Sequence, residues 1–212
     1  MTRSQEENIG IVGAGALGKA IAAHLGRCSI RCAICNSRAP ATLDKIAQSL
    51  GPSVRAATLE EAVAPEIVIL ALPWARVPEM LERVPDWEGR IVIDATNPFC
   101  TRHTAAFPEA DCSPSERIVQ LAPGAHIVMA FNCLPAELLA RHPEETVGRR
   151  VIFYSGNHAR AKRRVAALIF GLGFAPLDLG PLATGGHLLR STNEALTTLN
   201  LVQLPIPASA RP

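Results

Sequence analysis

The sequence has few aromatic side chains and no block of like charge. Aromatic residues make up 4% of the 212 residues, and tyrosine occurs once. Because the hydrophobic fraction is nevertheless 48%, the interior is expected to be largely aliphatic, which suits helices packed on a parallel sheet. The formal net charge is only +2. Nothing in this composition indicates binding to nucleic acid or to an anionic membrane surface.

A signal peptide and a membrane-spanning segment are also missing from the sequence. Residues 1–7 are polar and lack the apolar core of a signal peptide. The longest apolar runs, such as 67–73, fall far short of the roughly 20 residues that a membrane span needs. We therefore expect a soluble cytoplasmic protein that acts on a small molecule, with no membrane or nucleic-acid partner.

The cysteines and histidines lack the spacing of a metal site. The six cysteines show no paired ligand spacing, and the six histidines form neither an HxxxH nor an HExxH motif. Cys32 and Cys35 form a lone CxxC inside an apolar run, which we interpret as two buried thiols of a strand. A GxSxG nucleophile motif and an evident acid–base pair are absent too. No metal site is predicted, and no catalytic side chain is assigned.

Apolar runs of strand length alternate with helical patterns along the chain. This alternation predicts a doubly wound α/β fold with a mostly parallel sheet. A joint near 147–149 divides a first domain, 1–148, from a small C-terminal α/β subdomain, 149–212, on the same sheet. Strands are expected at 8–12, 30–35, 53–56, 66–72, 90–94, 125–130, 150–154 and 174–177, and helices at 16–27, 42–50, 59–64, 77–84, 115–121, 135–141, 159–172 and through most of 184–202.

A glycine motif lies between the first expected strand and the first expected helix. In Gly13-x-Gly15-x-x-Gly18 the first glycine permits a tight turn, the second lets a pyrophosphate approach the backbone, and the third lets the helix pack on the strand. Ala16 and Leu17 stand at the start of that helix, whose free N–H groups favour a phosphate. The motif predicts a dinucleotide site, and the alternative is a tight turn without a nucleotide.

The residues after the second expected strand indicate which dinucleotide binds. NAD-binding proteins usually place a carboxylate there for the ribose 2′-hydroxyl. This sequence has Asn36, Ser37 and Arg38 instead, and Thr42 follows at the start of the next helix. A hydroxyl and a guanidinium suit a 2′-phosphate, which favours NADP(H). The alternative is an ordinary polar turn.

Further candidate contacts follow the fourth expected strand. Leu72, Pro73 and Trp74 leave the sheet at the edge where ligands of doubly wound folds bind. Pro73 stiffens this exit. Trp74 is expected at the rim of the crevice, where it either stacks on a flat ring or covers the edge.

Polar side chains follow the fifth and sixth expected strands. Asp94 is expected to cap a turn, Asn97 to bond a carboxamide, and Asn132 to orient a nicotinamide or a substrate. For each, a structural role in the loop is equally consistent with the sequence.

Five stretches of the sequence resemble one known family. They are 9–20, 36–38, 70–74, 125–135 and 177–182, in the expected order. The family is that of the NADPH-dependent reductases of the deazaflavin coenzyme F420, and the same motif order is similar to the NADPH domain of membrane ferric reductases. The stretch 177–182 is the most family-specific, because generic dinucleotide-binding domains do not require it.

The resemblance carries expectations for the fold, the ligands and the assembly. It implies that 1–148 is an NADP-binding Rossmann domain, that the glycine turn and Leu17 hold NADP, and that Ser37 and Arg38 meet the 2′-phosphate. It also implies a homodimer and hydride exchange with F420 or a flavin-like acceptor near Trp74, Asn97 and Asn132. The sequence departs from the family in two places: the segment 99–113 is longer and contains Cys100, His103 and Cys112, and the C-terminal helix ends early, in a proline-rich tail.

Two other functions remain open from the sequence. One is a dehydrogenase or imine reductase of the 6-phosphogluconate or pyrroline-carboxylate reductase type, although only about 30 residues follow Pro181 and those enzymes have a substantial helical domain there. The other is a non-catalytic NADP-binding sensor, because no essential catalytic side chain is identifiable.

Overall fold

The computed structural model describes residues 9–84, 86–96, 114–145, 148–189, 196 and 199–205. Within these residues, no helix is both long enough and apolar enough to cross a membrane. The expected loop at 97–113 lies entirely outside the described residues. Cys100, His103 and Cys112 are therefore not placed.

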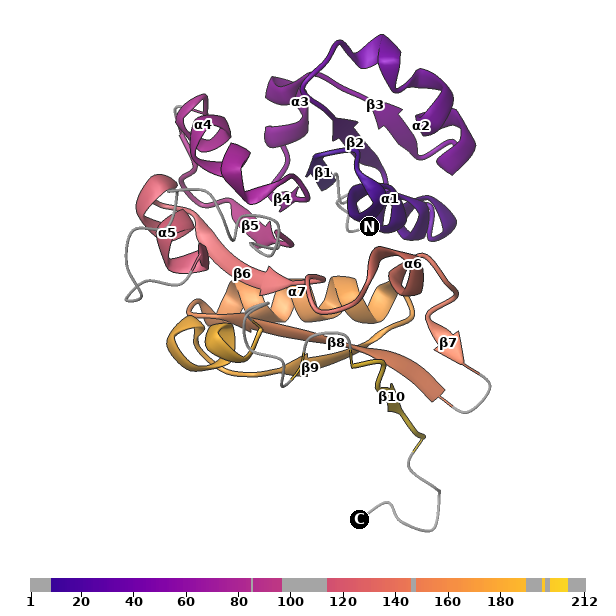
Figure 1. The fold of residues 1–212 in the computed structure, drawn as a ribbon, viewed down its shortest axis with the longest axis vertical. Coiled ribbons are helices and arrows are strands. Elements are labelled where there is room, and N and C mark those ends of the chain that lie inside the picture. The colour runs from indigo at the N-terminus through magenta and orange to yellow at the C-terminus, as the bar shows by residue number, and fades with distance from the viewer. Residues whose placement is uncertain are drawn as a thin grey trace, which may run out of the picture.

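One sheet of ten strands runs through the described part of the chain (Figure 1). Its order is β10-β8-β6-β5-β4-β1-β2-β3, while β7 and β9 also pair with β8. The pairs from β3 through to β6 are all parallel, so the predicted doubly wound fold is confirmed. The strands are β1 (Ile9–Val12), β2 (Cys32–Cys35), β3 (Val54–Ala56), β4 (Ile67–Leu70), β5 (Ile91–Asp94), β6 (His126–Ala130), β7 (Glu144–Glu145), β8 (Gly148–Gly156), β9 (Ala175–Asp178) and β10 (Val202–Gln203).

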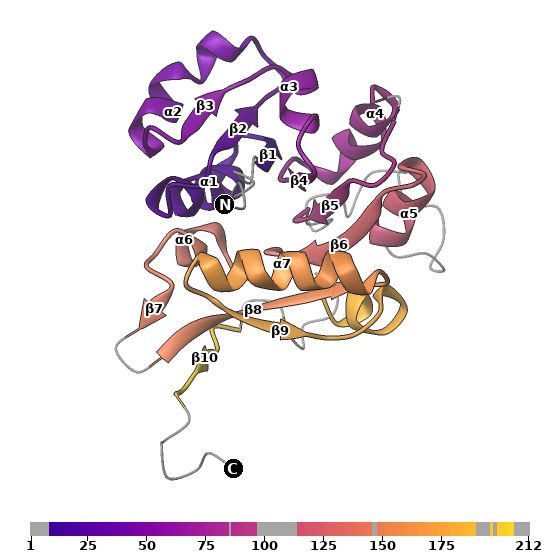
Figure 2. The same cartoon turned by 180° about the vertical axis from the view of Figure 1, so that it is seen from behind.

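Helices cover both faces of this sheet, because side chains alternate between its faces along each strand. In β1, Ile9 and Ile11 belong to one buried cluster, with residues of α1, α2, α6 and α7, whereas Val12 belongs to the other, with residues of α3, α4 and α5. The reverse view in Figure 2 shows α7 lying across β8 and β9. The helices are α1 (Ala16–Arg27), α2 (Asp44–Leu50), α3 (Leu59–Val63), α4 (Val77–Glu82), α5 (Pro114–Leu121), α6 (Ala136–Leu139) and α7 (Ala159–Gly171).

The C-terminal part of the chain continues the same sheet. β8 pairs antiparallel with β6, and α7 then leads to β9, which pairs parallel with β8. Residues 149–212, expected as a small subdomain, thus supply most of β8 and all of β9 and β10. The domain boundary at 148 stays a prediction.

The helix expected through most of 184–202 is wrong at its C-terminal end. A π-helical turn, η4 (Leu182–Gly186), is followed by a short helical stretch to Leu188, but Val202 and Gln203 form a strand. Val202 is opposite Arg150 in β8. Because β8 extends beyond the end of β6, its first residues offer free backbone groups to this segment, and pairing with them overrides the helical pattern of apolar residues.

Candidate cofactor crevice

The three glycines of the motif lie in three different environments, and the predicted roles of Gly13 in the turn and of Gly18 in helix packing are confirmed. A Cβ atom on Gly13, whose φ is 116°, would lie 2.2 Å from the carbonyl oxygen of Ala71, so only glycine fits this turn. A Cβ atom on Gly18 would lie 1.9 Å from the carbonyl oxygen of Gly13, so this glycine lets α1 pack on β1. A Cβ atom on Gly15 would have no atom within 4 Å. Gly15 therefore opens the turn on the side where a phosphate group would approach.

The start of α1 adds backbone donors beside this opening. Gly15 is the N-cap of the helix and provides no side-chain cap, and its carbonyl accepts the first helical bond, from Lys19 N–H at 3.0 Å. The N–H groups of a first helical turn have no partner within the helix. Ala16 is exposed and Leu17 is half-buried at this place. The helix dipole and these N–H groups together favour an anion.

The register of the sheet brings three strand ends to one level. Val12 of β1 lies opposite Cys35 of β2 and opposite Leu70 of β4. The strands β2 and β3 lie on one side of β1, and β4, β5 and β6 lie on its other side. The strand order therefore reverses at β1, where the glycine turn follows the strand. Leu72, which is half-buried, and Pro73, which is exposed, follow β4 at this edge.

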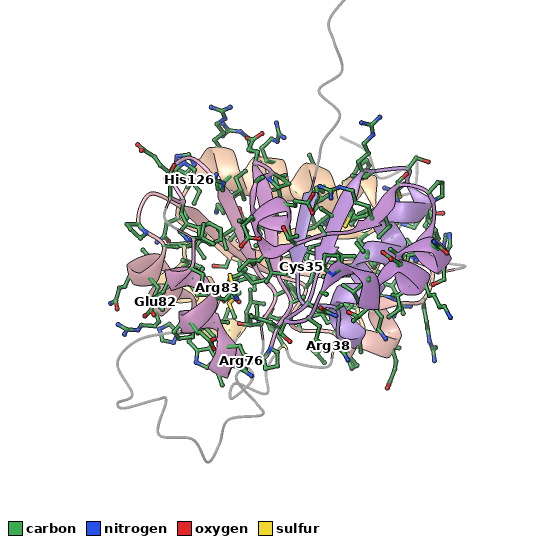
Figure 3. The ribbon with its side chains drawn as sticks, turned by 90° about the horizontal axis from the view of Figure 1, so that it is seen from above. Cys35, Arg38, Arg76, Glu82, Arg83 and His126 are labelled. Atoms are coloured by element: carbon green, nitrogen blue, oxygen red, sulfur yellow. The ribbon has the colours of Figure 1, made fainter. Side chains whose placement is uncertain are left out.

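The turn after β2 is shaped by Asn36 and leaves its neighbours in solvent. The side-chain oxygen of Asn36 accepts from the Arg38 backbone N–H at 2.8 Å, and its amide donates to the Thr42 hydroxyl at 3.2 Å. Ser37 and Arg38 are exposed, and the Arg38 side chain forms no ion pair with a described residue. Figure 3 shows Arg38 and Arg76 at the same edge of the molecule. Asn36 therefore orders the turn, and Ser37 and Arg38 are available to a ligand.

The sequence placed Trp74 at the crevice rim, and this placement is wrong. The side chain is only 3% exposed and belongs to the buried cluster that contains Val12, Val77 and Met129. It begins a short 3-10 turn, η2 (Trp74–Arg76), directly after Pro73. Burial of the large indole is more favourable than exposing it at the edge. Trp74 anchors the segment after β4, and its contact with a cofactor stays a prediction.

The polar residues after β5 and β6 have partners inside the protein. Asp94 is fully buried and accepts from both the backbone N–H, at 3.0 Å, and the hydroxyl, at 2.6 Å, of Thr96, as expected for a residue that caps a turn. Asn132 is 6% exposed and donates to the carbonyl of Leu189 at 3.0 Å. Asn97 lies outside the described residues. The contacts of Asn97 and Asn132 with a nicotinamide stay predictions.

The bond from Asn132 to Leu189 joins the C-terminal segment to the crevice edge, a link that sequence reasoning missed. Leu182 and Leu189, at the two ends of this segment, are buried in the same cluster as Met129 of β6. The segment is fixed at its start as well, because the Leu182 backbone N–H donates to the side-chain oxygen of Asn157 at 2.9 Å. Single-turn π segments are frequent near functional sites. The paired glycines at 185–186 were the only sequence signal for this irregular helix.

The family-specific stretch 177–182 forms the turn that leads into η4. Asp178 accepts from the Gly180 backbone N–H at 2.8 Å and pairs with Lys162 at 2.9 Å. The carbonyl of Gly180 accepts from the Ser155 hydroxyl at 3.0 Å and from the Gly156 backbone N–H at 3.1 Å. These residues therefore fix the C-terminal segment to the ends of β8 and α7.

The CxxC pair is buried in β2, as predicted. Cys32 and Cys35 face opposite sides of the sheet, because they belong to the two different buried clusters. Burial raises the pKa of the Cys32 thiol to about 12 and that of the Cys35 thiol to about 11. Their orientation and protonation both disfavour a disulfide between them. Among the described residues, no group of three His, Cys, Asp or Glu side chains is placed to hold a metal ion.

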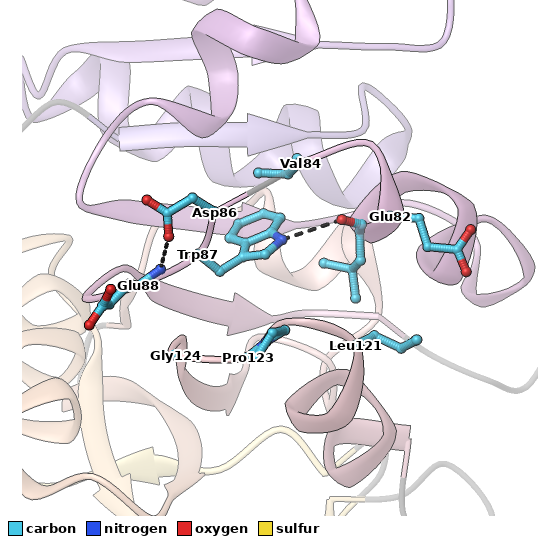
Figure 4. A pocket seen from close by; sticks show the side chains of 9 residues that line it. Glu82, Val84, Asp86, Trp87, Glu88, Leu121, Pro123 and Gly124 are labelled. Atoms are coloured by element: carbon cyan, nitrogen blue, oxygen red, sulfur yellow. Dashed lines mark hydrogen bonds between the residues drawn. The ribbon is translucent and has the colours of Figure 1, made fainter.

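A hollow of about 540 Å³ lies at the amino ends of β5 and β6, opposite the strand ends described above (Figure 4). It is lined by residues that precede β5, including Asp86 and Trp87, and by Pro123 and Gly124, which precede β6. The indole N–H of Trp87 donates to the carbonyl of Leu81 at 3.4 Å. None of the predicted site residues lines this hollow, so it is separate from the candidate site at the glycine turn.

Comparisons with known proteins show what the chain as a whole is similar to. Residues 8–98 match the family described as NADP oxidoreductase, coenzyme F420-dependent. The hypothetical protein SMa0349 from Sinorhizobium meliloti is 42% identical, with a TM-score of 0.84 over 92% of this chain and 95% of that one. A protein from Arthrobacter sp. FB24 with the provisional name F420-dependent NADP reductase is 25% identical, with a TM-score of 0.71 over 92% of this chain and 99% of that one.

A longer relative is similar as well. Metalloreductase STEAP3 from Rattus norvegicus is 29% identical over 83% of this chain and 34% of its own length. The chain thus spans about a third of the metalloreductase that it matches. The glycine turn, the end of β2 and the end of β4 all lie within residues 8–98, the part of the chain that matches the family described as NADP oxidoreductase, coenzyme F420-dependent.

Proposed function

We propose that the chain transfers hydride between NADPH and a deazaflavin or flavin-like acceptor, with coenzyme F420 as the first candidate. The glycine turn is the observation that carries this proposal. Gly15 leaves open space at the N-terminus of α1, whereas Gly13 and Gly18 have backbone carbonyls where a side chain would be. A turn built in this way fits a dinucleotide pyrophosphate.

In this proposal, different residues of the site contact different parts of the cofactor. Gly13, Gly15 and the helix start at 16–18 hold the pyrophosphate, and Ser37 and Arg38 meet the 2′-phosphate with charge-assisted hydrogen bonds. Leu72, Pro73 and Asn132 flank the nicotinamide half in this proposal, as does Asn97. NADPH, when bound, supplies the hydride.

Hydride transfer between two flat heterocycles mainly requires that the two rings are aligned and that water is excluded from the site. The strand-end edge suits the first requirement, because Asn132 is held by its bond to the carbonyl of Leu189, which is itself buried. The proposed role of the protein is therefore to position the two rings, with no protein acid or base assigned.

The names of the relatives support two kinds of acceptor. The matching family and the Arthrobacter protein are described by coenzyme F420, and STEAP3 is described as a metalloreductase. A deazaflavin and a flavin present a similar ring to NADPH, so one crevice suits either. A flavin acceptor would make the chain a source of electrons for ferric reduction.

The test is oxidation of NADPH, monitored as the loss of nicotinamide absorbance in five parallel reactions. These contain F420, FMN, a ferric chelate, a cyclic imine or no acceptor. Turnover with F420 alone supports the F420 assignment, and turnover with FMN supports the flavin assignment. Tight NADPH binding without turnover in any reaction would overturn the enzymatic proposal in favour of a sensor. Turnover with cyclic imines alone would favour an imine reductase.

Arg38→Ala tests the cofactor assignment separately. The substitution removes the guanidinium proposed at the 2′-phosphate, so we expect NADPH to bind at least tenfold more weakly and NADH to be nearly unaffected. Dissociation constants for both cofactors, measured by titration calorimetry, provide the comparison. Equal weakening of the two would contradict a contact with the 2′-phosphate.

A further inference from the structure

A second arginine, Arg76, lies on the other flank of the glycine turn. β1 is hydrogen-bonded to β2 on one side and to β4 on the other. Arg38 follows the β2 end, and Arg76 follows the β4 end through η2. The two flanking segments leave the sheet at one level, because Val12 is in register with both strand ends. Figure 3 shows both arginines at this edge.

Packing fixes the backbone at Arg76 while its side chain stays in solvent. Trp74 and Val77, on either side, are 3% and 0% exposed. The Arg76 backbone N–H donates to the Pro73 carbonyl at 2.9 Å, which closes the 3-10 turn. The Arg76 side chain is nevertheless 68% exposed. The burial of Trp74 and Val77 therefore fixes the backbone from which the Arg76 side chain extends into solvent.

The partner of Arg76 within the protein is a weak one. Its guanidinium lies 3.0 Å from a carboxylate oxygen of Glu79, whose side chain is 66% exposed. Exposed ion pairs of this kind are screened by water and contribute little to stability. A phosphate dianion would attract the guanidinium more strongly than this single carboxylate, because it carries more charge and three acceptor oxygens.

The 2′-phosphate also needs more positive charge than Arg38 supplies. It carries close to two negative charges near neutral pH, while one guanidinium supplies one positive charge. Ser37 adds a hydroxyl but no charge. A second guanidinium would balance the group, and the short turn after β4 presents that of Arg76 from the opposite flank of the glycine turn.

We propose that Arg76 is a second specificity residue for NADP(H), which exchanges Glu79 for the 2′-phosphate when the cofactor binds. This inference rests on the proposed NADP(H) site at the glycine turn. It adds that the segment after β4, and not only the one after β2, distinguishes NADPH from NADH. Glu79 then competes with the cofactor for the guanidinium.

The test compares the binding of NADPH and NADH to the full chain and four variants, by titration calorimetry at low and at high salt. Arg76→Ala should weaken NADPH about tenfold and leave NADH nearly unchanged. Glu79→Gln should tighten NADPH a few-fold, because it removes the competing carboxylate. Arg38→Ala is the positive control, and Arg163→Ala, an exposed arginine of α7, controls for the loss of one positive charge.

The outcomes separate this inference from the proposed function. If the unchanged chain shows no preference for NADPH, the proposed cofactor is wrong. If the preference is present and depends on Arg38 but not on Arg76, only the role of Arg76 is overturned. Equal weakening of NADPH and NADH by Arg76→Ala would also overturn it, since that result would place the guanidinium at the pyrophosphate. Thermal melting of each variant confirms that it remains folded.

Discussion

Alanine substitutions at Gly15 and at Gly18 should affect NADPH binding and the free energy of unfolding differently. A methyl group on Gly15 meets open space, and its φ of −72° is one that alanine adopts easily. Gly15→Ala should therefore leave the free energy of unfolding unchanged or raise it by up to about 1 kcal/mol. If a pyrophosphate approaches the backbone here, the same methyl group should weaken NADPH binding at least tenfold. Urea unfolding and NADPH titration measure the two effects.

Gly18→Ala is the matched comparison, because its methyl group would lie against the Gly13 carbonyl oxygen. Relieving that overlap requires a backbone shift, and we expect a loss of roughly 1–3 kcal/mol in the free energy of unfolding. Unaltered NADPH binding by Gly15→Ala would show that no ligand approaches this backbone. Unaltered stability of Gly18→Ala would show that α1 is not packed as described.

At the scale of elements, the sequence predicts best where local patterns and the fold agree. The helix expected at 16–27 matches α1 at both ends, since a glycine turn precedes it and its apolar residues have helical spacing. Exposed polar residues after β2 were also found from the sequence, because strand ends are visible in the apolar pattern. The parallel arrangement follows from the regular alternation of strands and helices.

The elements that were missed depend on contacts between distant parts of the chain. Val202 forms a strand because β8 has unpaired backbone beyond β6, which no local pattern reveals. Trp74 is buried because the segment after β4 folds into the cluster between the sheet and its helices. Asn132 is bonded to Leu189, 57 residues later in the chain. Partners of this kind are set by the tertiary structure, so residue type alone could not assign them.

The stability of the whole molecule should depend on pH through His24. This side chain of α1 is 2% exposed and bonds the Leu139 carbonyl at the end of α6. Burial lowers the pKa of its imidazole from 6.5 to about 4, with Arg27 contributing to the same direction. The unfolded chain therefore takes up a proton before the folded one does as the pH falls. Stability from this group is complete above pH 6.5 and is lost between about 6.5 and 4.

Urea unfolding between pH 7 and pH 4 measures this loss, which we expect to reach about 3 kcal/mol, at 1.36 kcal/mol for each unit of pKa. His24→Gln removes the titrating group and should flatten the pH dependence in this window. His187→Gln, at an exposed histidine that does not contribute to the His24 pKa shift, should leave it steep. An equally steep curve for His24→Gln would exclude His24 as the source.

We propose that the whole molecule is a homodimer, as the family resemblance implies, and that an apolar patch near the C-terminus takes part. The patch contains Phe170, Leu199, Leu201 and Leu204, which are 58%, 41%, 41% and 62% exposed. These residues gather around the start of β8, since the Leu201 carbonyl accepts from the Val151 backbone N–H and Arg149 covers the Phe170 ring.

Water contact with these four side chains is unfavourable, and a second copy of the chain would remove it. Light scattering after size-exclusion chromatography should give twice the chain mass, and Phe170→Glu combined with Leu204→Glu should give the mass of one chain. Lys45→Glu, an exposed change on α2, is the control for added negative charge and should stay dimeric. A single-chain mass for the unchanged protein at all concentrations would contradict the dimer, whereas a dimer that survives the double substitution would place the interface on another surface.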